Sequence, residues 1–207
     1  MTLFIDFDGT IIDVAKRYYR LHLHCLQETS NVLSMDTYWA LKRERISEES
    51  ILQTHYPKQD FTFYNKKRMD LIEDLSFLRD DELLPGARET LRTLQKKHTL
   101  ILATLRKRTD TLQQQIDLLN LRSLFQSIIV PSSPSKAEPW KAKMELLQSF
   151  AKKGDWMIGD TEADIRAGQE LGLVTCATLS GIRSASELAK AHPDHMITSI
   201  ADIPALL

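Results

Sequence analysis

The sequence is poor in cysteine, contains no long apolar run and carries no excess of either charge. Its two cysteines, Cys25 and Cys176, lie far apart and fit no metal-binding or redox spacing, so a reducing compartment is the simplest setting. Lys and Arg total 27 against 28 Asp and Glu, which excludes a strong global field toward nucleic acid or an anionic membrane. Internal repeats and low-complexity segments are also absent from the sequence.

The apolar runs are too short for a membrane protein. None approaches the ~20 residues needed to cross a bilayer. Asp6 and Asp8 interrupt the apolar run nearest the N-terminus, and no basic region precedes it. We therefore expect neither a signal peptide nor a membrane anchor, and a cytoplasmic location. The expected partners include no nucleic acid and no membrane.

The remaining composition is that of an ordinary globular protein, with 43% hydrophobic and 27% charged residues. A chain of 207 residues can bury one substantial core, or one core with a modest satellite domain. Apolar strands alternate with helical patterns along most of it. The expected strands are 3–7, 99–104, 127–130, 156–159, 173–178 and 195–199, and the expected helices between the later strands are 109–119, 139–150, 162–171 and 185–191. This alternation predicts an α/β fold, a parallel sheet with helices on both faces.

The segment between the first strand and the rest of the core has a different pattern. Residues 14–84 show amphipathic helical spacing and no convincing strand run. We therefore predict two domains: an α/β core of residues 1–13 and 85–207, and an inserted helical domain of residues 14–84. The hinges are expected near residues 12–14 and 84–86.

Polar side chains follow four of the predicted strands. They are Asp6 and Asp8 after the first, Thr104 after the second, Lys136 in the loop after the third, and Asp160 and Asp164 after the fourth. The carboxyl ends of parallel strands form the ligand crevice of such a sheet. Several carboxylates gathered there are best reconciled by a hard divalent cation such as Mg²⁺, and a lysine with a hydroxyl beside the cation suits a phosphoryl group.

The order and spacing of these residues resemble the haloacid dehalogenase-like superfamily of phosphohydrolases, whose core is a Rossmann-like α/β/α sandwich. "DFDGT" (Asp6–Thr10) and "GDTEAD" (Gly159–Asp164) carry the resemblance most strongly. The family implies that Asp6 is the nucleophile and that Asp8 is the general acid and base. Asp6 and Asp8 would then take two different roles because their environments differ, with Asp6 bound to the metal and the pKa of Asp8 raised.

The resemblance implies further roles. Mg²⁺ would be bound by Asp6, Asp160 and the backbone carbonyl of Asp8, and the phosphate by Thr104, Leu105 and Lys136, with Gly9, Thr10 and Asp164 in support. The expected function is Mg²⁺-dependent hydrolysis of a small phosphorylated metabolite, such as phosphoglycolate, a sugar phosphate or a nucleotide, by a monomer or homodimer. A phosphosugar mutase and a non-catalytic binding protein with the same fold are the alternatives.

The inserted segment resembles the small helical cap of the phosphoglycolate phosphatase and β-phosphoglucomutase-like branch. Such a cap closes over the crevice and contacts the leaving group. Five basic residues of the segment are candidates to meet an anionic tail of the substrate: Arg17, Arg20, Lys42, Arg43 and Arg45. His22 and His24 have no matching carboxylate pair and are expected to be surface or interhelical packing residues.

Three features leave alternatives open. The third motif reads "KAEP" and keeps only one of the two prolines usual in the family, so Lys141 and Lys143 stay candidates beside Lys136 for the phosphate-binding lysine. The basic run "LRKR" (105–108) after Thr104 fits a solvated helix start and a phosphate-attracting rim equally well. "DFDGT" taken alone also fits an Asp-Gly turn, but not a calcium loop, which needs a later Gly and a Glu at its twelfth position.

Overall fold

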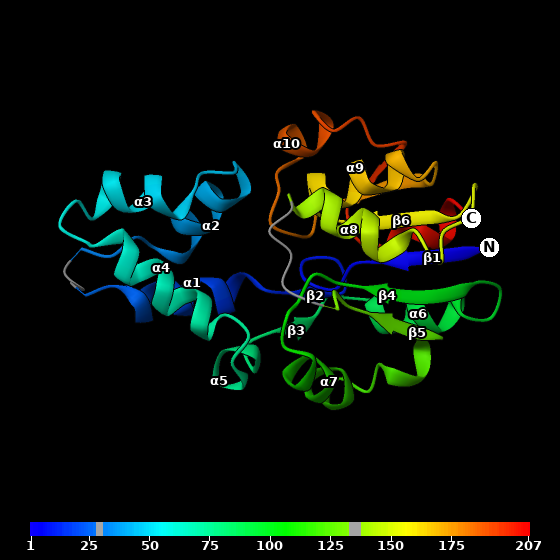
Figure 1. Ribbon diagram of the computed structural model, residues 1–207, viewed down its shortest axis with the longest axis horizontal. Coiled ribbons are helices and arrows are strands. Elements are labelled where there is room, and N and C mark those ends of the chain that lie inside the picture. Colours follow the sequence, from blue (N-terminus) through cyan, green and yellow to red (C-terminus); the bar gives the residue numbers. More distant parts are fainter. Residues whose placement is uncertain (28–30, 133–137) are drawn as a thin grey trace.

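The protein is described by a computed structural model that covers residues 1–27, 31–132 and 138–207. Six strands form one sheet in the order β5-β4-β1-β6-β7-β8, and all of their pairings are parallel. The strands are β1 (Thr2–Ile5), β4 (Thr99–Ala103), β5 (Ser127–Ile129), β6 (Trp156–Gly159), β7 (Val174–Thr178) and β8 (His195–Ile197). The predicted α/β fold is confirmed, and β1 lies at the centre of the sheet between β4 and β6 (Figure 1).

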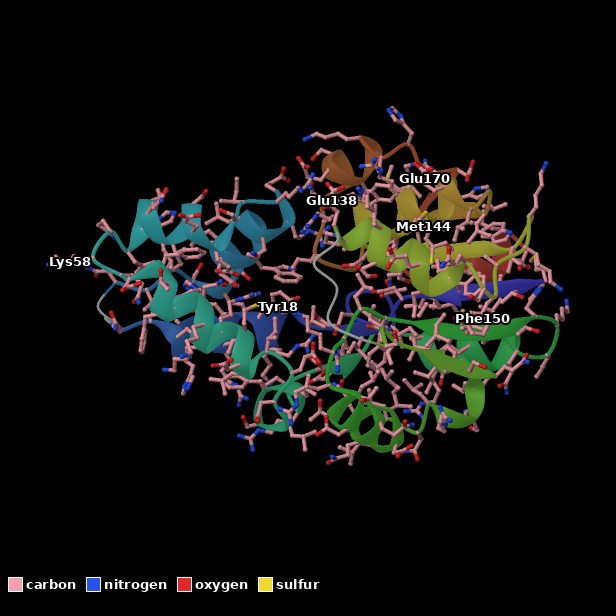
Figure 2. All side chains as sticks on the ribbon, viewed as in Figure 1. Tyr18, Lys58, Glu138, Met144, Phe150 and Glu170 are labelled. Carbon is pink, nitrogen blue, oxygen red and sulfur yellow. The ribbon has the colours of Figure 1, made fainter. Side chains whose placement is uncertain are left out.

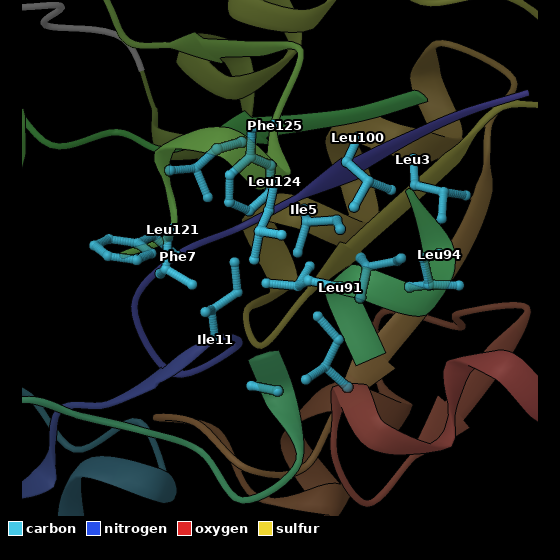
Figure 3. Close-up of a cluster of buried hydrophobic side chains, with 14 of the residues drawn as sticks. Leu3, Ile5, Phe7, Ile11, Leu91, Leu94, Leu100, Leu121, Leu124 and Phe125 are labelled. Carbon is cyan, nitrogen blue, oxygen red and sulfur yellow. The ribbon is translucent and has the colours of Figure 1, made fainter. Parts of the chain in front are cut away.

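Helices cover both faces of this sheet because successive strand residues point to opposite sides. The helices of the sheet region are α6 (Ala87–Leu94), α7 (Thr109–Leu118), α8 (Pro139–Leu147), α9 (Glu162–Glu170) and α10 (Ala185–Ala189), with short 3₁₀ turns at Arg122–Leu124 (η1) and Ile200–Ala205 (η2). Leu3 and Ile5 of β1 belong to a cluster shared with α6 and α7 (Figure 3). Phe4, between them, packs instead in a cluster that includes Leu147 of α8.

In the described part of the segment between β1 and α6, five helices form a lobe beside the sheet (Figure 1). They are α1 (Ala15–Cys25), α2 (Met35–Arg43), α3 (Glu48–His55), α4 (Phe61–Leu71) and α5 (Leu75–Leu78). A Ser or Asp side chain caps the N-terminus of each of the last four, as the local sequence favours. The lobe has a hydrophobic cluster of its own, which includes Leu21, Ile51 and Tyr64.

A buried polar network ties the lobe together around Glu48. Its carboxylate accepts hydrogen bonds from the hydroxyls of Tyr38 and Tyr64 at 2.8 and 3.0 Å, and it pairs with Lys42 and Arg68. His22 is also fully buried there, and its Nδ1 lies 2.7 Å from the Tyr64 hydroxyl. Burial lowers the pKa of His22 to about 4, so this histidine is a neutral packing residue between helices.

The lobe is joined to the sheet by two neighbouring chain segments. Strands β2 (Ile12–Asp13) and β3 (Glu82–Leu83) pair antiparallel in a small ribbon. β2 overlaps the first expected hinge, and β3 ends one residue before the second. The sequence prediction of no strand within residues 14–84 is therefore wrong for β3. Two residues are too few to show an alternating pattern, which explains why it was missed.

In the parts of the chain described here, no helix has both the length and the apolar character that crossing a bilayer requires.

Candidate active site

Asp6 lies directly after β1 and contacts a buried lysine. The Nζ of Lys143, on α8, donates to Oδ1 of Asp6 at 2.7 Å and to the carbonyl of Ala103 at 2.8 Å, and it pairs with Oδ1 of Asp164 at 2.8 Å. Burial raises the pKa of Asp6 to about 7, although Lys143 opposes the rise. Burial would lower the pKa of Lys143, but Asp164 and Asp6 outweigh it and raise that pKa. Lys143 is therefore a fixed cation against the candidate nucleophile.

Asp8 is held by two arginines. Arg106, in the loop after β4, donates from Nε to Oδ2 at 2.8 Å and from Nη2 to Oδ1 at 2.6 Å. Arg17, from α1 of the lobe, donates to the same Oδ1 at 2.5 Å. Burial alone would raise the pKa of Asp8, but Arg106 and Arg17 hold it well below its ordinary value. The raised pKa expected from the sequence is thus wrong for this arrangement, because the sequence did not reveal either arginine as a partner.

A second carboxylate, Asp81, holds the same two arginines from the other side. Its buried side chain lies 3.1 Å from Nε of Arg17 and 3.4 Å from Nη2 of Arg106, and it accepts from Nε2 of Gln115 at 2.8 Å. Two carboxylates and two guanidiniums therefore balance in charge where the lobe, the hinge and the core meet. Four charged side chains can be buried together at low cost only when their charges are paired in this way.

Asp160 and Asp164 follow β6 at the start of α9. Asp164 forms a capping box, accepting at Oδ2 from the backbone N–H and the hydroxyl of Thr161. Oδ2 of Asp160 accepts from the backbone N–H of Ile182 at 2.6 Å. Burial, together with Asp6 and Asp164, raises the pKa of Asp160 well above its ordinary value. Asp160 has no cationic side chain among its hydrogen-bond partners in the described residues.

These carboxylates fit a divalent cation. One oxygen each of Asp6, Asp160 and Asp164 lies within 4.8 Å of the others, and Lys143 alone cannot balance three ionised carboxylates. Both oxygens of Asp164 already have partners. Within the described residues, no hydrogen bond reaches Oδ2 of Asp6 or Oδ1 of Asp160. Those two oxygens are the ones left for a hard cation, and carboxylate oxygens are its preferred protein ligands.

A cavity of about 290 Å³ opens in front of these groups. Its walls combine Asp6, Asp8 and Asp160 with Thr104, Leu105 and Lys143. Thr104 is buried at the end of β4, and Leu105 follows it. The lobe contributes Arg17 and Tyr18 to the same walls, and Figure 2 shows Tyr18 where the lobe faces the sheet. The cavity is therefore lined from both the lobe and the sheet region.

Gly9 and Thr10 complete the turn after Asp8. Gly9 has φ +75°, and a Cβ there would lie 2.2 Å from Oδ2 of Asp160, so only glycine fits both the turn and the close approach. The Thr10 side chain is buried, and its hydroxyl has no hydrogen-bond partner among the described residues.

The three candidate lysines are distributed differently. Lys136 lies outside the described residues. Lys141 is half exposed and pairs with Glu138 at 3.4 Å, away from the carboxylates, whereas Lys143 is 2% exposed and contacts Asp6. The structure therefore brings Lys143, one of the two fallback candidates, to the site.

The five basic residues of the lobe that were candidates to meet an anionic substrate tail also have different contacts. Arg17 alone among the five reaches the cavity wall. Arg20 pairs with Asp80, Lys42 with Glu48 and Arg45 with Glu162, while Arg43 donates to backbone carbonyls of the sheet region.

Comparison with known proteins places this geometry in a family. The sequence model of the haloacid dehalogenase-like hydrolase family matches residues 3–178 of this chain. The chain belongs to the haloacid dehalogenase-like hydrolase family. The resemblance inferred from the sequence motifs is confirmed at this level, and the match includes the helical lobe as well as most of the sheet.

Similarity to known proteins extends over the whole chain. The pyrophosphatase PpaX of Listeria monocytogenes is 26% identical over 218 aligned residues, which cover 100% of this chain and 95% of that protein. A predicted phosphatase from Clostridium acetobutylicum has a similar structure, with a TM-score of 0.75, 20% identity, and coverage of 99% of this chain and 96% of that one. A predicted phosphoglycolate phosphatase from Haemophilus somnus gives a TM-score of 0.75 at 16% identity, covering 99% and 96%. These structures show the same fold.

Three features of the site were not predicted from the sequence. Arg106 belongs to the basic run for which a solvated helix start and a phosphate-attracting rim were both open, and its contact with Asp8 was not foreseen. Arg106 is 4% exposed, whereas its neighbours Lys107 and Arg108 are exposed. Its position just after a strand end was the available signal. Asp81 and the backbone N–H of Ile182 had no local signal, because their importance arises only from residues distant in sequence.

Proposed function

We propose that this hydrolase is a Mg²⁺-dependent phosphatase that releases phosphate from a small phosphomonoester through an aspartyl-phosphate on Asp6. The observation that carries the proposal is the contact of Lys143 with Oδ1 of Asp6, in a cavity that Asp160 also lines. Fixed positive charge beside a carboxylate nucleophile favours the approach of a phosphate anion.

The chain's own residues divide the reaction into two steps. A carboxylate oxygen of Asp6 attacks phosphorus, the bond to the leaving oxygen breaks, and Asp8 gives that oxygen a proton. Asp8 then takes a proton from water as the water attacks phosphorus, and the Asp6 carboxylate is released with free phosphate. Thr104 and Lys143 hold the transferred group. Mg²⁺, held by Asp6, Asp160 and the backbone carbonyl of Asp8, would offset the negative charge of the phosphoryl oxygens.

The arginines beside Asp8 support an anionic substrate. Both guanidiniums reach the cavity, and both contact Asp8 in this structure. A guanidinium that turns from Asp8 to a substrate oxygen would leave Asp8 free to carry the proton. We further propose that residues 14–84 act as the cap domain, because Arg17 brings the lobe into the same cavity. The names of the relatives make phosphoglycolate the first phosphomonoester to consider, with inorganic pyrophosphate, a phosphoanhydride, tested beside it.

The test is phosphate release from a panel of small phosphorylated compounds, with Mg²⁺ and with excess chelator. The panel contains pyrophosphate, phosphoglycolate, sugar phosphates, nucleotides and p-nitrophenyl phosphate. We expect release that depends on Mg²⁺ and favours one compound. Metal-independent release would contradict the metal role. If the folded protein released no phosphate but moved it between hydroxyls of a sugar phosphate, the mutase alternative would replace this proposal.

A further inference from the structure

The loop after β7 lies between the helical lobe and Asp160. Arg43, the last residue of α2, donates from Nη2 to the carbonyl of Leu179 at 3.0 Å and from Nη1 to the carbonyl of Gly181 at 2.9 Å. The backbone N–H of Ser184 in turn donates to the carbonyl of Arg43 at 2.9 Å. One residue of the lobe thus holds the loop of residues 179–184 by three hydrogen bonds.

The same peptide group contacts both Arg43 and Asp160. The carbonyl of Gly181 and the N–H of Ile182 belong to one planar peptide unit, so fixing one end fixes the other. The carbonyl accepts from Arg43 at 2.9 Å, and the N–H donates to Oδ2 of Asp160 at 2.6 Å. A charged donor on the carbonyl also polarises the peptide and strengthens the hydrogen bond that its N–H donates.

Close packing leaves this loop little freedom. A Cβ at Gly181 would lie 1.8 Å from Oδ2 of Asp160, so the backbone itself rests against the carboxylate. The hydroxyl of Ser180 donates to the carbonyl of Gly9 at 2.8 Å, which ties the loop to the turn after Asp8. A displacement of the loop would therefore reach Asp160 directly.

We propose that Arg43 is a positioning residue that couples docking of the lobe to assembly of the metal site. With the lobe docked, Arg43 orients the Gly181–Ile182 peptide, and the peptide N–H holds Oδ2 of Asp160, which leaves Oδ1 for the cation. The inference rests on the proposed role of Asp160 as a metal ligand. Because coupling is reciprocal, a cation bound at Asp160 favours the docked lobe to the same degree.

The test compares Arg43→Ala with the wild type in two assays that need no substrate. Mn²⁺ binding is measured by electron paramagnetic resonance, and hydrogen exchange of the Ile182 amide is measured by NMR. We expect Arg43→Ala to bind Mn²⁺ about tenfold more weakly, within the usual range of coupling between sites, and to exchange the Ile182 amide faster. Arg43→Lys reaches one carbonyl instead of two and should recover part of the binding.

Arg45→Ala is the matched control. Arg45 lies on the same segment and pairs with Glu162 at 3.2 Å across the same junction, but its side chain is 59% exposed, and it donates to no described residue of the loop. We expect this variant to bind Mn²⁺ like the wild type. With p-nitrophenyl phosphate, added Mg²⁺ should restore kcat to Arg43→Ala, which a general loss of folding would not allow.

Each outcome bears on a different part of the inference. Unchanged Mn²⁺ affinity in Arg43→Ala, with binding intact in the wild type, would overturn the coupling and leave the proposed phosphatase standing. If Arg45→Ala weakened Mn²⁺ binding as much as Arg43→Ala, the coupling would also be overturned. Loss of any contact between the lobe and the sheet region would then be enough to weaken the metal site. A wild type that binds no Mn²⁺ would overturn the metal role of Asp160, and the coupling with it.

Discussion

Replacement of Lys143 by methionine tests the site most sharply, since Met keeps most of the volume and removes only the charge. Lys143 contacts Asp6, Asp164 and the carbonyl of Ala103 at 2.7–2.8 Å while 2% exposed. Removing one partner from a buried ion pair costs about 3–5 kcal/mol of unfolding free energy. We expect about 3 kcal/mol at pH 8, because Asp6 can relieve part of the cost by taking up a proton. Its pKa, already raised to about 7, would rise further without the lysine.

The assays are urea unfolding at pH 8 and pH 6 and phosphate release with Mg²⁺. The stability deficit relative to the wild type should shrink at pH 6, since a raised carboxyl pKa favours the folded state at low pH. Phosphate release should fall about 100- to 1,000-fold, as for loss of one fixed donor to a developing anion. Lys141→Met is the matched control, and this exposed site should change stability by less than about 0.5 kcal/mol. Full activity in Lys143→Met, with loss in Lys136→Met, would refute the assignment.

Two further predictions follow from the carboxylates. Asp6→Asn should abolish phosphate release without loss of the fold, since the nucleophile is removed and the volume is kept. A turnover assay measures the activity and thermal melting measures the fold. Turnover of the variant at the wild-type rate would show that Asp6 is not the nucleophile. In metal-free protein, ionising Asp6 becomes unfavourable because its pKa rises from 3.8 to about 7, so the free energy of unfolding should fall by roughly 4 kcal/mol between about pH 4 and pH 7. Mg²⁺ should offset this loss, so the rise in Tm on adding Mg²⁺ should grow over that interval; a rise independent of pH would contradict the metal role of Asp6.

Much of the fold could be predicted because its signals are local. Strands such as 99–103 and 156–159 are short apolar runs between helical patterns, and both were found with nearly the observed bounds. Once the sheet is known to be parallel, the carboxyl ends of β1, β4 and β6 must lie together, since these strands are neighbours. That alone brings Asp6, Thr104 and Asp160 to one cavity.

The choice of lysine could not be made in this way. Lys143 and Asp6 are 137 residues apart in sequence, and their contact depends on how α8 packs against β4 and β1. The spacing to Asp160 favoured Lys136, and nothing local separates a buried lysine from the exposed Lys141 two residues earlier. Burial and partners of a long side chain are set by tertiary packing, not by the helical pattern that contains it.

The sequence by itself therefore determined the parallel α/β sheet, the family and the residue types at the strand ends, because periodicity and strand-end position are properties of neighbouring residues. Tertiary structure alone decided how those residues are charged and held. It placed Arg17 and Arg106 on Asp8, with Asp81 behind them, and so reversed the expected direction of the Asp8 pKa. It also set one peptide of a loop between Arg43 and Asp160. Such contacts join segments far apart in the chain, and their electrostatic effect depends on burial and distance, which no local pattern contains.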